Sequence, residues 1–323
     1  ALCLVLIGSA GTALAQQGRS IGEPGRTNKP SAKPNPLKNV YFGEQHIHTR
    51  NSPDAFAMGT RGTWEDVHRY AMGEEIVLST TGQKIRKSTP YDFVGLTDHS
   101  EYFGVMPRLI DPKDPLSKSD FAKKLAAPDA SSTSPDSAIS IILRSILTST
   151  PMPEYVKPEI LVGDWARYVK TANKFNKPGR FTTLIAYEWT SIPNGRNMHR
   201  NVFFRDDKGP ETVLSALDTV RREDLWTYQE VQRAAGHENF SIPHNANVSN
   251  GLMFAPTTSS GTLIDTHWAK RSNLNTVATE IIQTKGQSET HPALSPNDEF
   301  ASFETSYKHL LGSGGVVRRI NNG

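Results

Sequence analysis

Two histidines separated by one residue, His46 and His48, follow a short apolar stretch. Residues two apart on a strand point to the same side, so both imidazoles can bind one ion. Neutral imidazole is a common ligand of Zn²⁺, Fe²⁺ and Mn²⁺. A single H-x-H pair is a weak signal, and a metal site needs further ligands from elsewhere in the chain.

Three later apolar stretches also end in residues of types that bind metals. These residues are His99, Glu188 and His244, which follow the stretches 93–96, 184–187 and 240–243, with Asp98 directly before His99. The carboxyl ends of parallel strands converge in α/β folds, so residues far apart in sequence become neighbours there. We therefore expect these side chains to join His46 and His48 in one metal site.

Three further residues are candidates for the same site. His199 lies in the loop after Glu188 and is predicted to be an additional ligand, or a catalytic acid. Asp54 follows the H-x-H pair by a short loop and could reach the site, although Asp after Ser-Pro is equally often a turn residue. Asp98 and His99 are candidate catalytic residues. For Asp98 the alternative is that it only orients a ligand.

The roles of Glu280 and His267 stay open. Glu280 lies late in an apolar, β-branched stretch, where it either faces the site or pairs with a buried Arg. His267 lies beside Trp268 after a flexible Ser/Gly stretch. The remaining histidines have polar or charged neighbours, and we expect them to be solvated: His68, His237, His291 and His309.

Other catalytic chemistries find no support in the sequence. It has no G-x-S-x-G motif of a serine hydrolase and no phosphate-binding P-loop. The only cysteine, Cys3, lies in the apolar N-terminal stretch, so a metal must use nitrogen and oxygen ligands. Buried His and Glu at strand ends can also be purely structural groups, but the shared location of this set favours a metal site.

The elements that must position these residues alternate between strands and helices. The predicted strands are 40–48, 91–97, 181–188, 201–204, 240–244 and 276–282, and the predicted helices are 63–73, 161–175 and 227–235. Thr63 is the expected cap of the first helix, with Asp66 three residues later. This order predicts an α/β fold with a mostly parallel sheet, either open or closed into a barrel. Residues 104–160 interrupt it as a predicted surface insertion, helical at 138–147, and a candidate lid.

The ends of the chain depart from this pattern. Residues 1–15 begin with a short apolar run and end in Ala13-Leu14-Ala15, which is typical of a partial signal peptide. The run is shorter than the roughly 20 apolar residues of a spanning helix, so we expect a periplasmic or secreted protein without a stable membrane anchor. Residues 16–38 are predicted to be a disordered linker, and residues 312–323 an irregular tail.

Charge narrows the range of partners. The net charge is +3, and no Lys/Arg cluster is interleaved with aromatic residues. This distribution argues against nucleic acid as a partner and leaves a small molecule as the expected substrate. The folded part of the chain is expected to begin near residue 39.

The ligand-type residues follow one another in an order that resembles the PHP superfamily, named for polymerase and histidinol phosphatase. The resemblance rests on H-x-H at 46–48, T-D-H at 97–99, Glu188, His199 and I-P-H at 242–244. The phrases YFGEQHIHT, DFVGLTDHSEYFG, LIAYEWTS and IPHN resemble more closely the exported PHP-like branch described as domain of unknown function 3604. The resemblance covers about residues 39 to 311.

The resemblance implies a distorted (β/α)₇ barrel that holds two or three Zn, Mn or Fe ions. His46 and His48 would hold the first ion, and Glu188 would bridge two ions. His99, His199 and His244 would complete the other coordination shells. The superfamily also has a late D-x-H element, and no D-x-H after His244 fits, so we expect the chain to stop before the closing strands of the barrel.

A metal-dependent phosphoesterase that uses a metal-activated water is the predicted function, with a small anionic substrate. Hydrolysis of an amide or a lactone at the same site is an alternative that these residues do not separate from it. A second alternative, from another class, is a catalytically incomplete fragment that binds metal without turnover.

Overall fold

The computed structural model describes residues 39–303, except 128, 131, 133, 291, 293 and 294. The predicted signal peptide, linker and tail therefore lie outside the described residues, as do Cys3, His291 and His309. No helix in the part of the chain that the structure describes is both long enough and apolar enough to cross a membrane.

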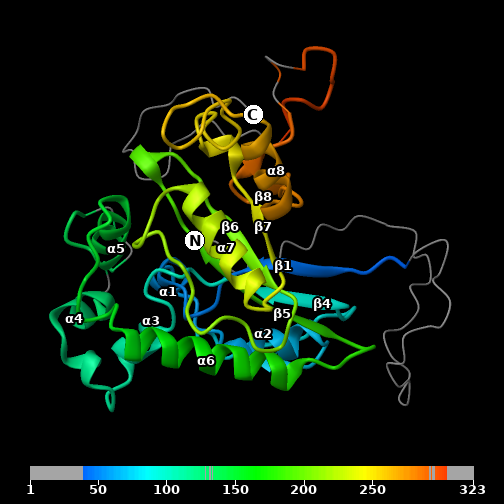
Figure 1. Ribbon diagram of the computed structural model, residues 1–323. Helices are drawn as coiled ribbons and strands as arrows, with labels where there is room; N and C mark the ends of the chain where they lie inside the picture. Colours follow the sequence, from blue (N-terminus) through cyan, green and yellow to red (C-terminus); the bar gives the residue numbers. More distant parts are fainter. Residues whose placement is uncertain are drawn as a thin grey trace.

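A five-stranded sheet forms the centre of the molecule (Figure 1). Its strands are β1 (Gly43–Ile47), β4 (Phe93–Leu96), β5 (Thr182–Trp189), β6 (Arg200–Phe204) and β7 (Asn239–Pro243), and they lie side by side in this order. Each overlaps a strand that the sequence predicts. β1, β4 and β5 are parallel, as predicted, and β6 is antiparallel to both of its neighbours.

The reversed direction of β6 differs from the mostly parallel sheet predicted. Only residues 190–199 connect β5 to β6, and a parallel crossover needs a dozen or more residues. The chain therefore turns back beside β5, and β7 again runs in the direction of β1, β4 and β5. The fold is α/β with a parallel-rich sheet, and the described strands do not close into a barrel.

The predicted strand 276–282 differs most from the structure. The chain runs beside β7 at two points, a parallel bridge between Ser241 and Thr276 and a hydrogen bond from Glu280 N to Pro243 O. Between these points the side chain of Val277 is 59% exposed. Apolar β-branched residues are present, but no layer of the described structure packs over them, so a continuous ladder does not form there.

Helices cover the sheet at several places. α2 (Trp64–Ala71) and α6 (Pro158–Phe175) pack beside β4 and β5, and α7 (Arg222–Ala234) and α8 (Thr266–Asn275) pack beside β7. The predicted cap of α2 is confirmed, because Thr63 and Asp66 form a reciprocal capping box. Buried aromatic side chains of β5, β6 and α6 dominate the core between these layers: Trp165, Tyr168, Tyr187, Trp189 and Phe204.

Residues 104–160 fold into several helices gathered at one end of the sheet (Figure 1). They are α3 (Val105–Ile110), the 3₁₀ helix η1 (Pro115–Lys118), α4 (Asp120–Ala126) and α5 (Ala138–Leu147). The range of α5 is the predicted one. A second hydrophobic core joins α5 to Phe56 of α1 (Pro53–Ala57) and to Ile192 near η2 (Pro193–Gly195). The insertion therefore packs against the segments before and after the strand ends.

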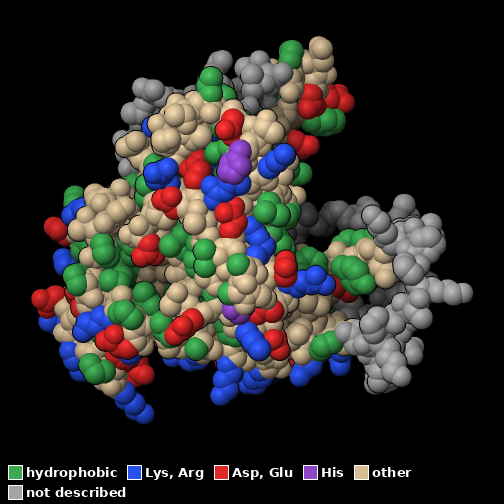
Figure 2. Space-filling model, viewed as in Figure 1, with side chains coloured by type: hydrophobic (Ala, Val, Ile, Leu, Met, Phe, Trp, Pro, Cys, Tyr) green, Lys and Arg blue, Asp and Glu red, His purple; other side chains and the backbone are tan. Residues whose placement is uncertain are grey.

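The remaining short elements lie at the periphery. They are β2 (Ile76–Val77), β3 (Lys84–Ile85), η3 (Ala246–Val248), β8 (Ile282–Gln283) and β9 (Gly286–Gln287). On the face shown in Figure 2, acidic and basic side chains are interspersed over most of the surface. This mixture agrees with the small net charge of the chain.

Candidate metal centre

The strand ends bring together the six residues that the sequence predicts as ligands. His46 belongs to β1, Glu188 is next to last in β5, and His244 directly follows β7. His48 and His99 lie just beyond β1 and β4. His199 directly precedes β6, and because β6 is antiparallel, its start lies at the same edge of the sheet as the other strand ends.

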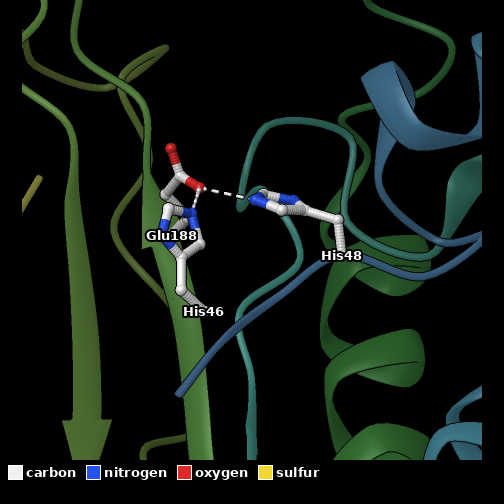
Figure 3. A group of neighbouring side chains, drawn as sticks. All are labelled: His46, His48 and Glu188. Carbon is white, nitrogen blue, oxygen red and sulfur yellow. Dashed lines mark ion pairs between the residues drawn. The ribbon is translucent and has the colours of Figure 1, made fainter. Parts of the chain in front are cut away.

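Glu188 lies at the centre of the cluster and is 1% exposed. Its Oε2 is 2.9 Å from His48 Nε2 and 3.4 Å from His46 Nε2, and Figure 3 shows both imidazoles directed at this oxygen. Its Oε1 is 2.7 Å from His199 Nδ1 and 3.2 Å from His244 Nε2. Oε1 also lies 3.6 Å from His99 Nδ1. One carboxylate therefore contacts imidazoles at the ends of all four other strands of the sheet.

The cluster divides into three groups that could each hold a metal ion. The groups are His46, His48 and Glu188; His48, Asp54 and His99; and Glu188, His199 and His244. Within each group the candidate ligand atoms lie within 4.8 Å of one another. Glu188 and His48 each belong to two groups, so neighbouring ions could share a ligand.

The donor atoms fit divalent cations. Among the described residues, no hydrogen-bond partner reaches His199 Nε2 or His244 Nδ1, although both atoms are buried. A buried polar atom without a partner is costly, and a ligand in the site would satisfy it. The donors are imidazole nitrogen and carboxylate oxygen, a set that suits Zn²⁺, Mn²⁺ or Fe²⁺.

The histidines of the site are of two kinds, those with a raised pKa and those with a lowered pKa. Burial acts to lower the pKa of His46, but its hydrogen bonds to Glu188 and Glu280 outweigh burial and raise the pKa to about 9. Burial also acts to lower the pKa of His99, but the negative charges of Glu188 and Asp54 outweigh it and raise the pKa to about 10. At His199 and His244 burial prevails, and the pKa falls to about 4 for His199 and well below the usual range for His244.

Glu188 itself stays ionised despite its burial. Burial acts to raise its pKa, but the charge of His99 and the contacts with His199 and His244 hold the pKa well below the usual range for a glutamate. The fold therefore maintains a buried anion with imidazoles around it. Such an arrangement favours a cation at the same place.

Asp54 lies in the first turn of α1 and reaches the site. Its Oδ2 is 3.3 Å from His99 Nε2, and its Oδ1 is 3.9 Å from His48 Nδ1. Of the two alternatives left by the sequence, the structure places Asp54 with the candidate ligands. The first turn of α1 follows His48 closely enough for both side chains to reach one ion.

Asp98 points to a different place. Its carboxylate accepts hydrogen bonds from the backbone N and the hydroxyl of Thr49 and from Nε1 of Trp64. Asp98 therefore fixes the backbone next to His48, which favours the orienting alternative over direct catalysis. Its predicted catalytic role stays a prediction.

The structure decides between the two alternatives for Glu280, which were to face the site or to pair with a buried arginine. Its Oε2 accepts a hydrogen bond of 2.7 Å from Nδ1 of His46, and no arginine among the described residues pairs with it. This bond leaves Nε2 of His46 directed toward Glu188. A carboxylate that fixes the far nitrogen of a ligating imidazole is a common outer partner of metal sites.

Two hydroxyl partners of the ligands were not predicted. Ser52 Oγ lies 2.8 Å from His48 Nδ1, and Thr190 Oγ1 hydrogen-bonds to His99 Nδ1. Thr190 lies two residues after Glu188, but no pattern in the sequence distinguishes it from other threonines. Both hydroxyls hold an imidazole so that its other nitrogen faces the cluster.

The other described histidines lie outside the site. His267 is exposed in α8, and His237 is half-buried beside Asp206. The prediction that His68 is solvated was wrong, because it is 1% exposed and stacks on Phe175. The charged neighbours of His68 in sequence lie on other faces of α2, whereas His68 itself faces α6.

Together, the sheet and the cluster define an α/β protein with a buried His/Glu/Asp site at its strand ends that could hold metal ions. The family described as Protein of unknown function (DUF3604) matches residues 35–315, and the chain belongs to this family. This match confirms the resemblance of the sequence motifs to domain of unknown function 3604. Searches of curated proteins and of solved structures found no match to the chain.

Proposed function

We propose that this chain is a metal-dependent hydrolase of the PHP type that acts on phosphoesters. The observation that carries the proposal is the position of Glu188, which belongs to two ligand groups at once. A carboxylate shared in this way suits a pair of neighbouring ions, the arrangement used for in-line displacement at phosphorus. The order of the ligands along the chain supports the PHP assignment, including its barrel fold.

Charge favours an anionic substrate. Three carboxylates contact the imidazoles of the site: Asp54, Glu188 and Glu280. With a pair of divalent ions bound, positive charge at the site would exceed the negative charge of these groups. A phosphate ester would restore the balance, which a neutral amide or lactone would not.

The chemistry divides between the ions and the protein. Bound divalent ions would supply activated water and would stabilise negative charge on the phosphoryl oxygens. His99 and His199 are the candidate acids for the leaving group, since both lie within the cluster beside Glu188. Each also belongs to a ligand group, His99 with Asp54 and His199 with Glu188 and His244, so each can serve as an acid only if its group holds no ion. A pair of ions that shares Glu188 would occupy the group of His199, which favours His99 as the acid.

The first test is turnover by the full chain loaded with Mn²⁺ or Zn²⁺. p-Nitrophenyl phosphate should be hydrolysed, and a double variant, His46→Ala with His48→Ala, should lose both metal and activity. A p-nitrophenyl ester, an anilide and a lactone serve as the comparison panel. Hydrolysis of a panel compound but not of the phosphate would show that the enzyme acts on another type of bond. Bound metal without turnover of any compound would show that the protein binds metal without catalysis.

Export is part of the same proposal. The short apolar run and the Ala13-Leu14-Ala15 sequence before Gln16 support a signal peptide and a periplasmic or secreted location. Fractionation of cells that express the full gene, with N-terminal sequencing of the product, tests this part. Product that begins near Gln16 outside the cytoplasm is the expected result.

A further inference from the structure

A short segment after α8, residues 280–288, lies over the edge of the metal centre. It begins at Glu280, which binds His46, and continues into the hairpin of β8 and β9. We call it the 280–288 segment. Its side chains reach the site although it belongs to neither the central sheet nor a helix.

Five hydrogen bonds fix this segment to the chain around His244. They are Glu280 N to Pro243 O, Gln283 Nε2 to Asn245 Oδ1, Asn247 Nδ2 to Lys285 O, Ser288 Oγ to Asn247 Oδ1, and Asn247 N to Ser288 Oγ. The backbone of the hairpin turn is therefore held beside a metal ligand. Lys285 is in that turn, and its side chain starts from a fixed point at the edge of the site.

The charge of Lys285 acts on two site residues from different elements. At Asp54, burial acts to raise the pKa, whereas the charges of His99, His48 and Lys285 lower it well below the usual range. At His199, burial lowers the pKa and the contact with Glu188 acts to raise it. The charge of Lys285 lowers the pKa further. The turn that carries Lys285 is fixed next to His244, and its ammonium group is close enough to act on residues of α1 and of the segment before β6.

The ammonium group of Lys285 is free to take a ligand. Lys285 is exposed, and it forms no ion pair with a carboxylate in the described part of the chain. A cation next to a metal centre weakens metal binding through charge repulsion unless an anion lies between them. A lysine in this position is suited to a phosphate, which accepts charge-assisted hydrogen bonds from an ammonium group.

We propose that Lys285 binds the anionic group of the substrate at the mouth of the metal centre. This inference rests on the proposed function, and it identifies a residue that selects phosphate monoesters and other dianions over neutral molecules. Lys285 would donate charge-assisted hydrogen bonds to oxygens of the phosphate group. The 280–288 segment thus combines two tasks, since Glu280 positions His46 and Lys285 recognises the substrate.

Phosphate binding provides a test that does not require turnover. The full chain is loaded with Mn²⁺, and its affinity for inorganic phosphate is measured by calorimetry. Lys285→Gln should weaken binding by about tenfold or more, as expected for loss of a charge-assisted contact. Lys285→Arg should restore most of the affinity, and Lys270→Gln, which removes an exposed lysine of α8, should leave it unchanged. Metal content should be equal in all four proteins.

The outcomes separate this inference from the proposed function. Equal phosphate affinity of wild type and Lys285→Gln, or no phosphate binding by the wild type, overturns the role of Lys285. Phosphate binding that depends on Lys285, without turnover of p-nitrophenyl phosphate, supports that role and overturns phosphoester hydrolysis. Turnover with an unchanged KM in Lys285→Gln supports hydrolysis and overturns the role of Lys285.

Discussion

Two buried parts of the described structure contain histidine, and only one of them raises the pKa of any imidazole. At the strand ends, burial acts to lower the pKa, but contacts with Glu188 raise it to about 9 for His46 and to about 10 for His99. At His199 and His244, in the same cluster, burial prevails. In α2, burial lowers the pKa of His68 to about 4, and its hydrogen bond to Trp64 O offsets only part of this effect.

The difference shows what distinguishes a ligand site from a structural histidine. His68 is buried, is hydrogen-bonded to Trp64 O and is stable as a neutral ring stacked on Phe175. The strand-end histidines surround a carboxylate that stays ionised although it is buried. Burial alone therefore does not mark function, whereas burial around a retained negative charge creates a place for a cation.

Removing the central carboxylate should have the largest effect. Glu188→Gln keeps the shape of the side chain but takes the shared ligand from two of the three groups. Loss of an outer partner of a metal ligand lowers metal affinity by up to about 100-fold, so loss of a shared ligand should lower it by more than about 100-fold. Metal content after dialysis, measured by plasma mass spectrometry, tests this expectation.

Glu223→Gln is the matched control for that variant. Glu223 is also buried, but it binds Ser259 and Trp268 away from the cluster. Metal content should stay at the wild-type level in this control. Wild-type metal content in Glu188→Gln would remove the basis for the comparison between the two kinds of buried histidine.

His68 should make the protein less stable as the pH falls. Its pKa is 6.5 in the unfolded chain and about 4 in the folded protein, so the unfolded state binds the proton first. The stability it contributes is complete above about pH 6.5 and is lost as the pH falls toward about 4, in total about 3 kcal/mol. Urea unfolding of the metal-free protein across this range measures the loss.

His68→Phe isolates this contribution. The variant keeps a ring against Phe175 but has no group that titrates there. The difference in unfolding free energy between wild type and variant should shift by about 3 kcal/mol between the two ends of the pH range. A constant difference would show that His68 does not titrate with the lowered pKa.

The bond between Glu280 and His46 should have an intermediate effect. Glu280→Gln removes the negative charge that fixes Nδ1 of His46 but leaves every candidate ligand in place. Loss of such an outer partner lowers metal affinity by about 10-fold to 100-fold. Competition with a chromogenic chelator measures the change. Glu289→Gln, an exposed carboxylate nearby, is the control, and an equal loss there would point to a general charge effect.

The smallest effect is expected at His267. This residue is exposed in α8, outside the ligand groups found among the described residues. His267→Ala should leave metal content and metal affinity unchanged. A clear loss of metal in this variant would mean that the site includes α8.

Much of the fold could be predicted because its signals are local. The capping box at Thr63, the range of α5 and the approximate limits of five strands follow from residue periodicity and cap residues. The direction of β6 was not predicted, although the connection before it is too short for a parallel crossover. The burial of His68 could not be predicted, because it depends on α6, which lies far along the chain.

The candidate ligands could be predicted for a related reason. Five of the six are His or Glu at or just beyond the end of an apolar stretch, and parallel strands bring such ends to one edge. The sixth, His199, was predicted from its place in the loop after Glu188, and it reaches the same edge at the start of the antiparallel β6. The same reasoning could not assign Asp98, which is also at a strand end. Its carboxylate turns to Thr49 and Trp64, and this choice depends on the tertiary positions of both partners.

The sequence by itself determined which residue types stand at the strand ends, and with them the kind of ion that the site could hold. Only the tertiary structure decided which atoms face the ion and which residues support them. His46 and Glu280 are 234 positions apart, yet they share a hydrogen bond. Periodicity describes the chain over a few residues, whereas such a contact depends on how the strands and the loops beyond them pack in space.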